Sequence, residues 1–175
     1  VICVPMVMAA EGMVLVAARD PVGIPTACFG ETEGVRLGER LGLLPASLET
    51  TGSGAIWFHA VSVGEVLSLV ELVRQLRAQR PSVQLFVSTT TLAGRATAEQ
   101  KLAGLADGVF FAPLDYRSIV RRVLRQLRPS LVVVLETEIW PNLYRETKRA
   151  GASLMVVNGR ISGRALPRTE SPKHS

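Results

Sequence analysis

The stretch AIWFHAVSVGEV, residues 55–66, runs from an apolar segment into a glycine and a carboxylate. Residues 55–61 have the composition of a buried strand, and apolar residues spaced by three and four from Val66 to Leu76 predict a helix over 64–79. A strand that leads at once into a helix is the unit from which parallel sheets are built. The stretch therefore predicts an α/β fold and places Gly64 and Glu65 at the turn between strand and helix.

The same alternation continues downstream. Further strands are expected at 83–88, 108–112, 131–136 and 153–158, with helices at about 92–104, 116–127 and 140–150. Five strands joined by right-handed crossovers make one Rossmann-like domain, in which helices flank a parallel sheet. We expect this domain over residues 55–162.

The flanking segments differ in composition. Residues 1–37 predict turns and a small β-hairpin, residues 38–54 have linker composition, and residues 163–175 predict a disordered tail. The first ten residues are apolar, but Glu11 interrupts the run before it reaches the roughly 20 residues that a membrane span needs. The sequence therefore predicts no transmembrane helix.

The chain of 175 residues is basic, with a formal net charge of +5. This charge points to an anionic partner, which could be nucleic acid, phospholipid headgroups or a phosphorylated substrate. The arginines of 117–128 are expected to form a solvated helix face. Nucleic acid is the least favoured of these partners, because no aromatic residues interleave those arginines. The sequence contains no Walker loop, GxGxxG, HExxH or GxSxG motif, which argues against an ATPase, an NAD enzyme, a zinc protease and an ordinary α/β-hydrolase. Cys3 and Cys28 have no metal-ligand spacing.

Ligands of open parallel sheets bind outside the carboxyl ends of the strands, so the polar residues that follow each strand are the candidates for a site. These candidates include Ser62, Gly64, Glu65, Thr89, Thr90, Glu138 and Arg160. A glutamate in the first turn of a helix either stabilises the helix dipole or moves a proton. Hydroxyls that precede a helix either cap it or bind phosphate and sugar oxygens. Within the first strand, His59 is expected to be a core histidine.

Five segments resemble, in order and spacing, the N-terminal domain of the Kdo transferases, which attach 3-deoxy-D-manno-octulosonic acid (Kdo) to lipid A precursors. They are GERLGLLP at 38–45, IWFHAVSVGEV at 56–66, VSTTTLAGR at 87–95, LETEIWPNL at 135–143 and VNGRIS at 157–162. The resemblance covers about residues 38–162. It implies the N-terminal half of a GT-B glycosyltransferase, which receives the lipid acceptor, whereas the C-terminal half holds the donor CMP-Kdo.

The same resemblance implies roles for particular residues. Glu65 would be the general base on the acceptor hydroxyl, and Glu138 a further active-site carboxylate. Substrate contacts would come from Ser62, Gly64, Thr89, Thr90 and Arg160. The transfer would be inverting and would need no metal or cofactor.

The implied partners are a lipid A precursor, an anionic membrane surface and a C-terminal GT-B domain that this chain lacks, with no nucleic acid among them. The implied location is peripheral, on the cytoplasmic face of the bacterial inner membrane, or cytoplasmic for the chain alone. Without the donor-binding half, the chain by itself is not expected to transfer sugar. A module that binds an anionic lipid or sugar phosphate without catalysis is a further alternative.

A second resemblance lies in EGMVLVAARDPVGIPTACFGETEGVRLG, residues 11–38, which is similar to the start of a phage-type lysozyme. It implies that Glu11 is a general acid, that Asp20 stabilises the developing cation or its covalent adduct, and that Thr26 positions water. Peptidoglycan hydrolysis is thus an alternative function. Because the helical lobe of that family is missing from the sequence, we expect this segment to be a vestigial or spliced fragment.

Overall fold

The computed structural model describes residues 31–48, 52, 54–135 and 139–157. Its helices are α1 (Glu31–Arg40), the short 3-10 helix η2 (Ala46–Leu48), α2 (Val63–Gln79), α3 (Leu92–Lys101), α4 (Arg117–Leu127) and α5 (Pro141–Arg149). Its strands are β1 (Ala55–His59), β2 (Leu85–Thr89), β3 (Gly108–Phe111), β4 (Pro129–Leu135) and β5 (Ser153–Val157).

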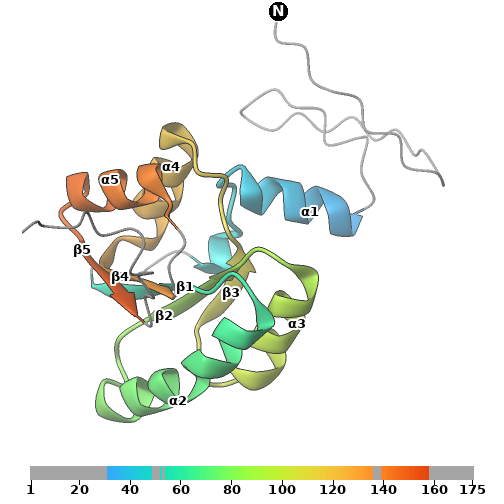
Figure 1. Cartoon of the computed structure of the whole chain (residues 1–175), viewed down its shortest axis with the longest axis vertical. Coiled ribbons are helices and arrows are strands. Elements are labelled where there is room, and N and C mark those ends of the chain that lie inside the picture. The colour runs from blue at the N-terminus through green and yellow to red at the C-terminus, as the bar shows by residue number, and fades with distance from the viewer. Residues whose placement is uncertain (1–30, 49–51, 53, 136–138, 158–175) are drawn as a thin grey trace, which may run out of the picture. The chain divides into compact units, whose positions relative to one another are not determined.

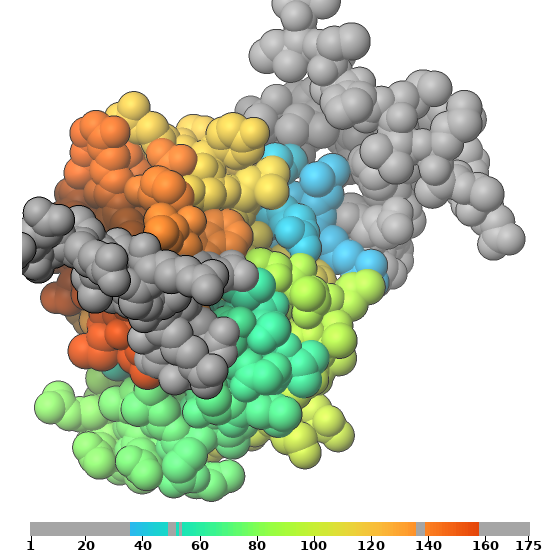
Figure 2. Space-filling model, in the orientation of Figure 1, coloured from blue at the N-terminus to red at the C-terminus, as the bar shows by residue number. Residues whose placement is uncertain are grey.

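The five strands form one parallel sheet in the order β3-β2-β1-β4-β5 (Figure 1). The strand β1 is central and pairs with both β2 and β4. Helices α2 and α3 lie on one side of the sheet, and α4 and α5 lie on the other. The same two layers are seen in the space-filling view, with α4 and α5 in yellow and orange and α2 in green (Figure 2). The predicted Rossmann-like α/β fold is confirmed.

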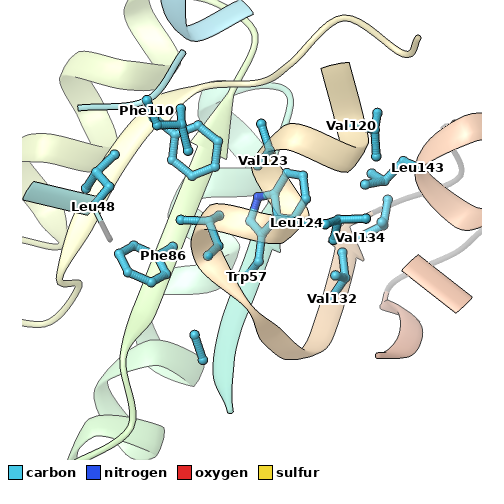
Figure 3. Packing of buried hydrophobic residues seen from close by; sticks show 13 residues of the cluster. Leu48, Trp57, Phe86, Phe110, Val120, Val123, Leu124, Val132, Val134 and Leu143 are labelled. Carbon is cyan, nitrogen blue, oxygen red and sulfur yellow. The ribbon is translucent and has the colours of Figure 1, made fainter. Parts of the chain in front are cut away.

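Alternate residues of each strand enter two separate apolar clusters, as the two-residue period of a strand requires. In β1, Trp57 packs with Phe86, Phe110 and the apolar stripe of α4 (Figure 3). Its neighbour Phe58 packs on the opposite face with residues of α2 and α3. Because both faces of β1, β2 and β4 are largely buried, most residues of these strands are apolar, whereas the edge strand β5 is more exposed.

The segment before β1 corrects two predictions. Residues 31–37 were expected to form turns, but they belong to helix α1, whose sequence has acids at its start and arginines toward its end, as the helix dipole favours. The glycines of this segment indicated turns, and they misled the prediction. Within the expected linker 38–54, Leu44 and Leu48 are buried in the cluster of Trp57, so this part packs as core.

The chain divides into two compact units at Gly38 and Glu39. The predicted hairpin at residues 1–30 and the predicted tail at 163–175 lie outside the described residues. Within the described residues, no helix combines the length and the apolar character needed to cross a bilayer.

Candidate functional site at the carboxyl edge of the sheet

Glu65 lies in the first turn of α2, where the chain leaves the central strand β1. Ser62 is the N-cap residue, and its hydroxyl oxygen accepts the amide of Glu65 at 3.3 Å. In return, the Glu65 carboxylate accepts the amide of Val61 at 2.7 Å through Oε2 and the hydroxyl of Ser62 at 2.9 Å through Oε1. These contacts closely resemble the reciprocal hydrogen bonding of a capping box. Glu65 therefore caps its helix in this structure.

The capping contacts occupy only part of the hydrogen-bonding capacity of the Glu65 carboxylate. Each carboxylate oxygen has two acceptor positions, and each oxygen of Glu65 receives one hydrogen bond from the described residues. The side chain is buried, with 5% of its surface exposed. A substrate hydroxyl that reached the remaining position would meet an oriented, partly desolvated base.

Gly64 leaves open space next to this carboxylate. A Cβ atom built on Gly64 would meet nothing closer than the Ser62 hydroxyl, at 3.9 Å. The glycine itself is exposed. Packing within the described chain therefore does not require a glycine here, whereas a ligand that approaches the helix N-terminus would benefit from the missing side chain.

Thr89 is the last residue of β2, which lies next to β1 in the sheet, and Thr90 follows it. Thr89 is fully buried, and its hydroxyl finds no hydrogen-bond partner among the described residues. Thr90 is half-buried, and its hydroxyl donates to the carbonyl of Val61 at 2.9 Å. The next residue, Thr91, caps α3 by accepting the amide of Gly94. The structure thus brings Thr90 to the turn that carries Glu65.

The end of α1 contacts the same edge, which the sequence did not predict. Glu39 is 2% exposed; it pairs with Arg95 of α3 at 2.5 Å and accepts the amide of Phe111 at 2.7 Å. The guanidinium of Arg40 donates to the carbonyl of Thr90 at 2.5 Å, and both arginines lie over the ring of Phe111. Glu39 and Arg40 therefore hold the carboxyl ends of β3 and β2 through hydrogen bonds to the backbone.

His59 is a core residue, as its apolar surroundings predict, and one of its ring nitrogens makes a hydrogen bond with Ser88. Trp57 Nε1 donates to Ser88 Oγ at 2.9 Å, and Ser88 Oγ lies 2.9 Å from His59 Nδ1. The serine oxygen can accept two hydrogen bonds and donate one, so His59 Nδ1 either accepts from the hydroxyl or donates to it, according to the tautomer of the ring. Burial lowers the pKa of His59 from 6.5 to about 4, which keeps the ring neutral at pH 7. Among the described residues Nε2 has no hydrogen-bond partner, although the ring packs edge-on against Trp140.

A second polar cluster lies between α4 and α5. Glu146 is 2% exposed and pairs with Arg117, Arg121 and Arg149, with contacts between 2.5 and 3.3 Å. The hydrogen bond from Arg121 lowers the pKa of Glu146 to about 2 against the opposing effect of burial, and Arg149 lowers it further. The prediction that the α4 arginines form a solvated face is therefore wrong for Arg117 and Arg121, which pair with Glu146 because α5 packs beside α4.

A groove lined by arginines, here called the basic groove, lies beside this cluster at the amino ends of β1 and β4. Its volume is about 1120 Å³. The charged residues that line it are Arg121, Arg122, Arg125, Arg128, Arg149 and Glu146. Five guanidinium groups against one carboxylate make this groove a favourable place for anions. It is at the opposite edge of the sheet from Glu65.

Several predicted site residues lie outside the described residues. They are Glu138 and Arg160 of the transferase-like set and Glu11, Asp20 and Thr26 of the lysozyme-like set. Among the described residues, no group of three or more His, Cys, Asp or Glu side chains is arranged to hold a metal ion.

Comparison with known proteins gives a consistent result. A family model described as 3-deoxy-D-manno-octulosonic-acid transferase (kdotransferase) matches residues 35–174. The 3-deoxy-D-manno-octulosonic acid transferase of Chlamydophila psittaci is 34% identical over 132 residues, which cover 75% of this chain and 30% of that protein. The enzyme of the same name from Haemophilus influenzae is 35% identical over 135 residues, 76% of this chain and 31% of that protein. That of Chlamydia pneumoniae is 39% identical over 107 residues, 61% of this chain and 24% of that protein.

The chain thus spans less than a third of the length of these relatives. The family match begins at residue 35, beyond most of the lysozyme-like stretch, so these findings give the lysozyme resemblance no support.

Proposed function

This chain belongs to the 3-deoxy-D-manno-octulosonic-acid transferase family, and on that premise we propose that it forms the acceptor-binding part of an enzyme that transfers Kdo from CMP-Kdo to a lipid A precursor in lipopolysaccharide biosynthesis. The observation that carries the proposal is the oriented carboxylate of Glu65 beside the open position of Gly64. The donor would bind a further GT-B domain, outside the part of the family that this chain matches.

In the proposed reaction Glu65 is the general base. An acceptor hydroxyl approaches over Gly64, its oxygen attacks the anomeric carbon of Kdo, and its proton passes to the Glu65 carboxylate. The bond from the anomeric carbon to CMP breaks as the new bond forms on the opposite face, so the configuration inverts and CMP leaves with the electron pair. The hydrogen bonds from Val61 and Ser62 hold the carboxylate in one orientation, which favours catalysis by fixing the base before the substrate arrives.

Other residues are proposed to contact substrate. Ser62 is proposed as a substrate contact at this edge, and Glu138 and Arg160 as a second carboxylate and a further contact. The predicted contact from Thr89 is not proposed, because its side chain is fully buried. An arginine there would suit a sugar phosphate or the Kdo carboxylate, because guanidinium groups bind such anions through paired hydrogen bonds. No metal or other cofactor takes part in the proposed reaction.

The test is restoration of transfer. The chain is combined with a separately produced donor domain of a family member, and Kdo transfer from CMP-Kdo to a lipid A precursor is followed. We expect Glu65→Gln, which keeps the shape of the side chain, to lower the rate by about a hundredfold or more, as for loss of a general base. The matched control is Glu71→Gln on the exposed face of the same helix, where Glu71 pairs only with exposed neighbours. Full activity of Glu65→Gln would refute the assigned base.

The basic surface is proposed to meet the anionic headgroups of the inner membrane at its cytoplasmic face. The positive charge of the basic groove at the amino ends of β1 and β4 supports this partner. We expect co-sedimentation of the chain with vesicles that contain an acidic phospholipid, and weaker binding after Arg125→Glu and Arg128→Glu. Arg74→Glu, on the exposed face of α2, is the control. Equal binding to neutral and acidic vesicles would contradict this proposal.

A further inference from the structure

The hydroxyl of Thr90 makes a hydrogen bond within the chain. The hydroxyl donates to the carbonyl oxygen of Val61 at 2.9 Å, across 29 residues of sequence. The amide of the same residue, Val61, donates to Glu65 Oε2 at 2.7 Å. Val61 is therefore held at both of its backbone polar groups, on one side by Thr90 and on the other by the candidate base.

The backbone of Thr90 is itself held in place by contacts of neighbouring residues. Arg40 donates to the Thr90 carbonyl at 2.5 Å. The next residue, Thr91, begins α3 as its N-cap. A threonine is branched at Cβ and has few rotamers available, so a fixed backbone also fixes the direction of its hydroxyl. The hydroxyl of Thr90 thus lies at a defined point against the β1–α2 turn.

The first turn of α3 is packed closely against that turn. A Cβ atom on Gly94 would lie 2.9 Å from the hydroxyl oxygen of Thr91 and 3.7 Å from the carbonyl of Val61. The absence of a side chain at Gly94 lets the helix approach. The Val61 carbonyl is therefore enclosed between Thr90 and the helix, which limits the ways in which the peptide can rotate.

We infer that Thr90 is a positioning residue for the proposed transfer reaction, which aims the Glu65 carboxylate through Val61. This inference rests on the proposed function, and it replaces the prediction that Thr90 contacts substrate. Loss of the Thr90 hydroxyl frees the Val61 peptide to turn, and the carboxylate that accepts its amide then loses its orientation. A base displaced by about 1 Å is a much weaker catalyst, although substrate affinity is unchanged.

The first measurement uses the chain alone and needs no transfer activity. The Val61 amide proton is followed by NMR in Thr90→Val, with Thr90→Ser as the variant that keeps the hydroxyl. Thr97→Val is the matched control, because the Thr97 hydroxyl donates to a carbonyl within its own helix, α3. In wild type we expect the chemical shift of the Val61 amide proton to report its hydrogen bond to the Glu65 carboxylate, and Glu65→Gln to move that resonance.

In Thr90→Val we expect hydrogen exchange at Val61 to accelerate by about tenfold, as for loss of one buried hydrogen bond, and the Val61 amide resonance to move toward its position in Glu65→Gln. Thr90→Ser and Thr97→Val should behave as wild type. If Thr90→Val does not fold, Arg40→Met can be used instead. It removes the hydrogen bond from Arg40 to the Thr90 carbonyl and should produce the same change at Val61. Unchanged exchange and an unchanged Val61 amide resonance in the folded Thr90→Val or Arg40→Met variant would overturn the inference.

The second measurement is transfer in the reconstituted enzyme. A positioning role lowers kcat by about tenfold or more in Thr90→Val and leaves KM unchanged, and Thr90→Ser restores most of the rate. A rise in KM with kcat unchanged would overturn the inference, since it would indicate a substrate contact. If wild type transfers no Kdo at all, the proposed function fails, and the Val61 resonance still decides whether Thr90 orients Glu65.

Discussion

The buried histidine of β1 makes the stability of the domain depend on pH above the range in which carboxylates titrate. His59 is 1% exposed, and its only described hydrogen-bond partner is Ser88. Burial lowers its pKa in the folded chain from 6.5 to about 4. Between these values the unfolded chain binds a proton and the folded chain does not, so unfolding is favoured as the pH falls.

The size of the effect follows from the two pKa values. Each pH unit between them corresponds to about 1.4 kcal/mol, so the fall from 6.5 to about 4 corresponds to about 3 kcal/mol in the free energy of unfolding. This contribution is fully present above pH 6.5, decreases below it, and is lost by about pH 4. By pH 5 we expect about 2 kcal/mol of it to be gone.

Urea unfolding at pH 8, 7, 6 and 5 measures this loss directly. His59→Gln does not titrate, so it should be less stable than wild type at pH 8 but nearly independent of pH over the same range. The other histidine, His174, provides the control, and His174→Gln should keep the wild-type slope. A wild-type stability that is flat between pH 8 and pH 5, or a slope that disappears only in His174→Gln, would refute the reasoning.

Two further predictions follow from individual contacts. Gly64→Ala should leave the free energy of unfolding within about 1 kcal/mol of wild type, because a Cβ there meets only the Ser62 hydroxyl at 3.9 Å. Transfer in the reconstituted enzyme should nevertheless fall by at least about tenfold. Full transfer would show that the substrate does not use the open space beside Gly64. Glu146, with a folded pKa of about 2 against an ordinary 4.5, adds stability that is present above pH 4.5 and lost as the pH falls toward 2. Glu146→Gln should therefore flatten the acid limb of the stability profile in thermal unfolding, and an unchanged limb would mean that its arginine pairs contribute nothing.

Local pattern was sufficient for the fold and for part of the site. Apolar runs and helical spacing predicted all five strands and helices α2 to α5, because burial on a sheet or along a helix face imposes a short-range period on the sequence. The motif Ser62-Val63-Gly64-Glu65 also contains the spacing of a capping box, so the contact between Ser62 and Glu65 could have been predicted from four consecutive residues. Helix α1 was missed because its glycines outweighed its favourable charges.

The contacts between distant residues could not be predicted in the same way. Glu39 is buried because it accepts the amide of Phe111, which is 72 residues away. The arginines of α4 were assigned to solvent because nothing in their own segment indicates that α5 brings Glu146 against them. Charged side chains enter a protein interior only when partners arrive with them, and those partners are chosen by the packing of the layers.

The sequence by itself therefore determined the parallel sheet, its two helical layers and the position of Glu65 at the carboxyl end of the central strand. Only the tertiary structure decided what surrounds that carboxylate. The Val61 amide donates to Glu65, the Val61 carbonyl accepts the hydroxyl of Thr90 just after β2, and Glu39 and Arg40 hydrogen-bond the chain beyond it. The physical reason is the distance along the chain over which each kind of interaction acts. Periodicity and caps act over a few residues of chain, whereas the orientation of a catalytic group depends on hydrogen bonds between segments that meet only after the sheet has formed.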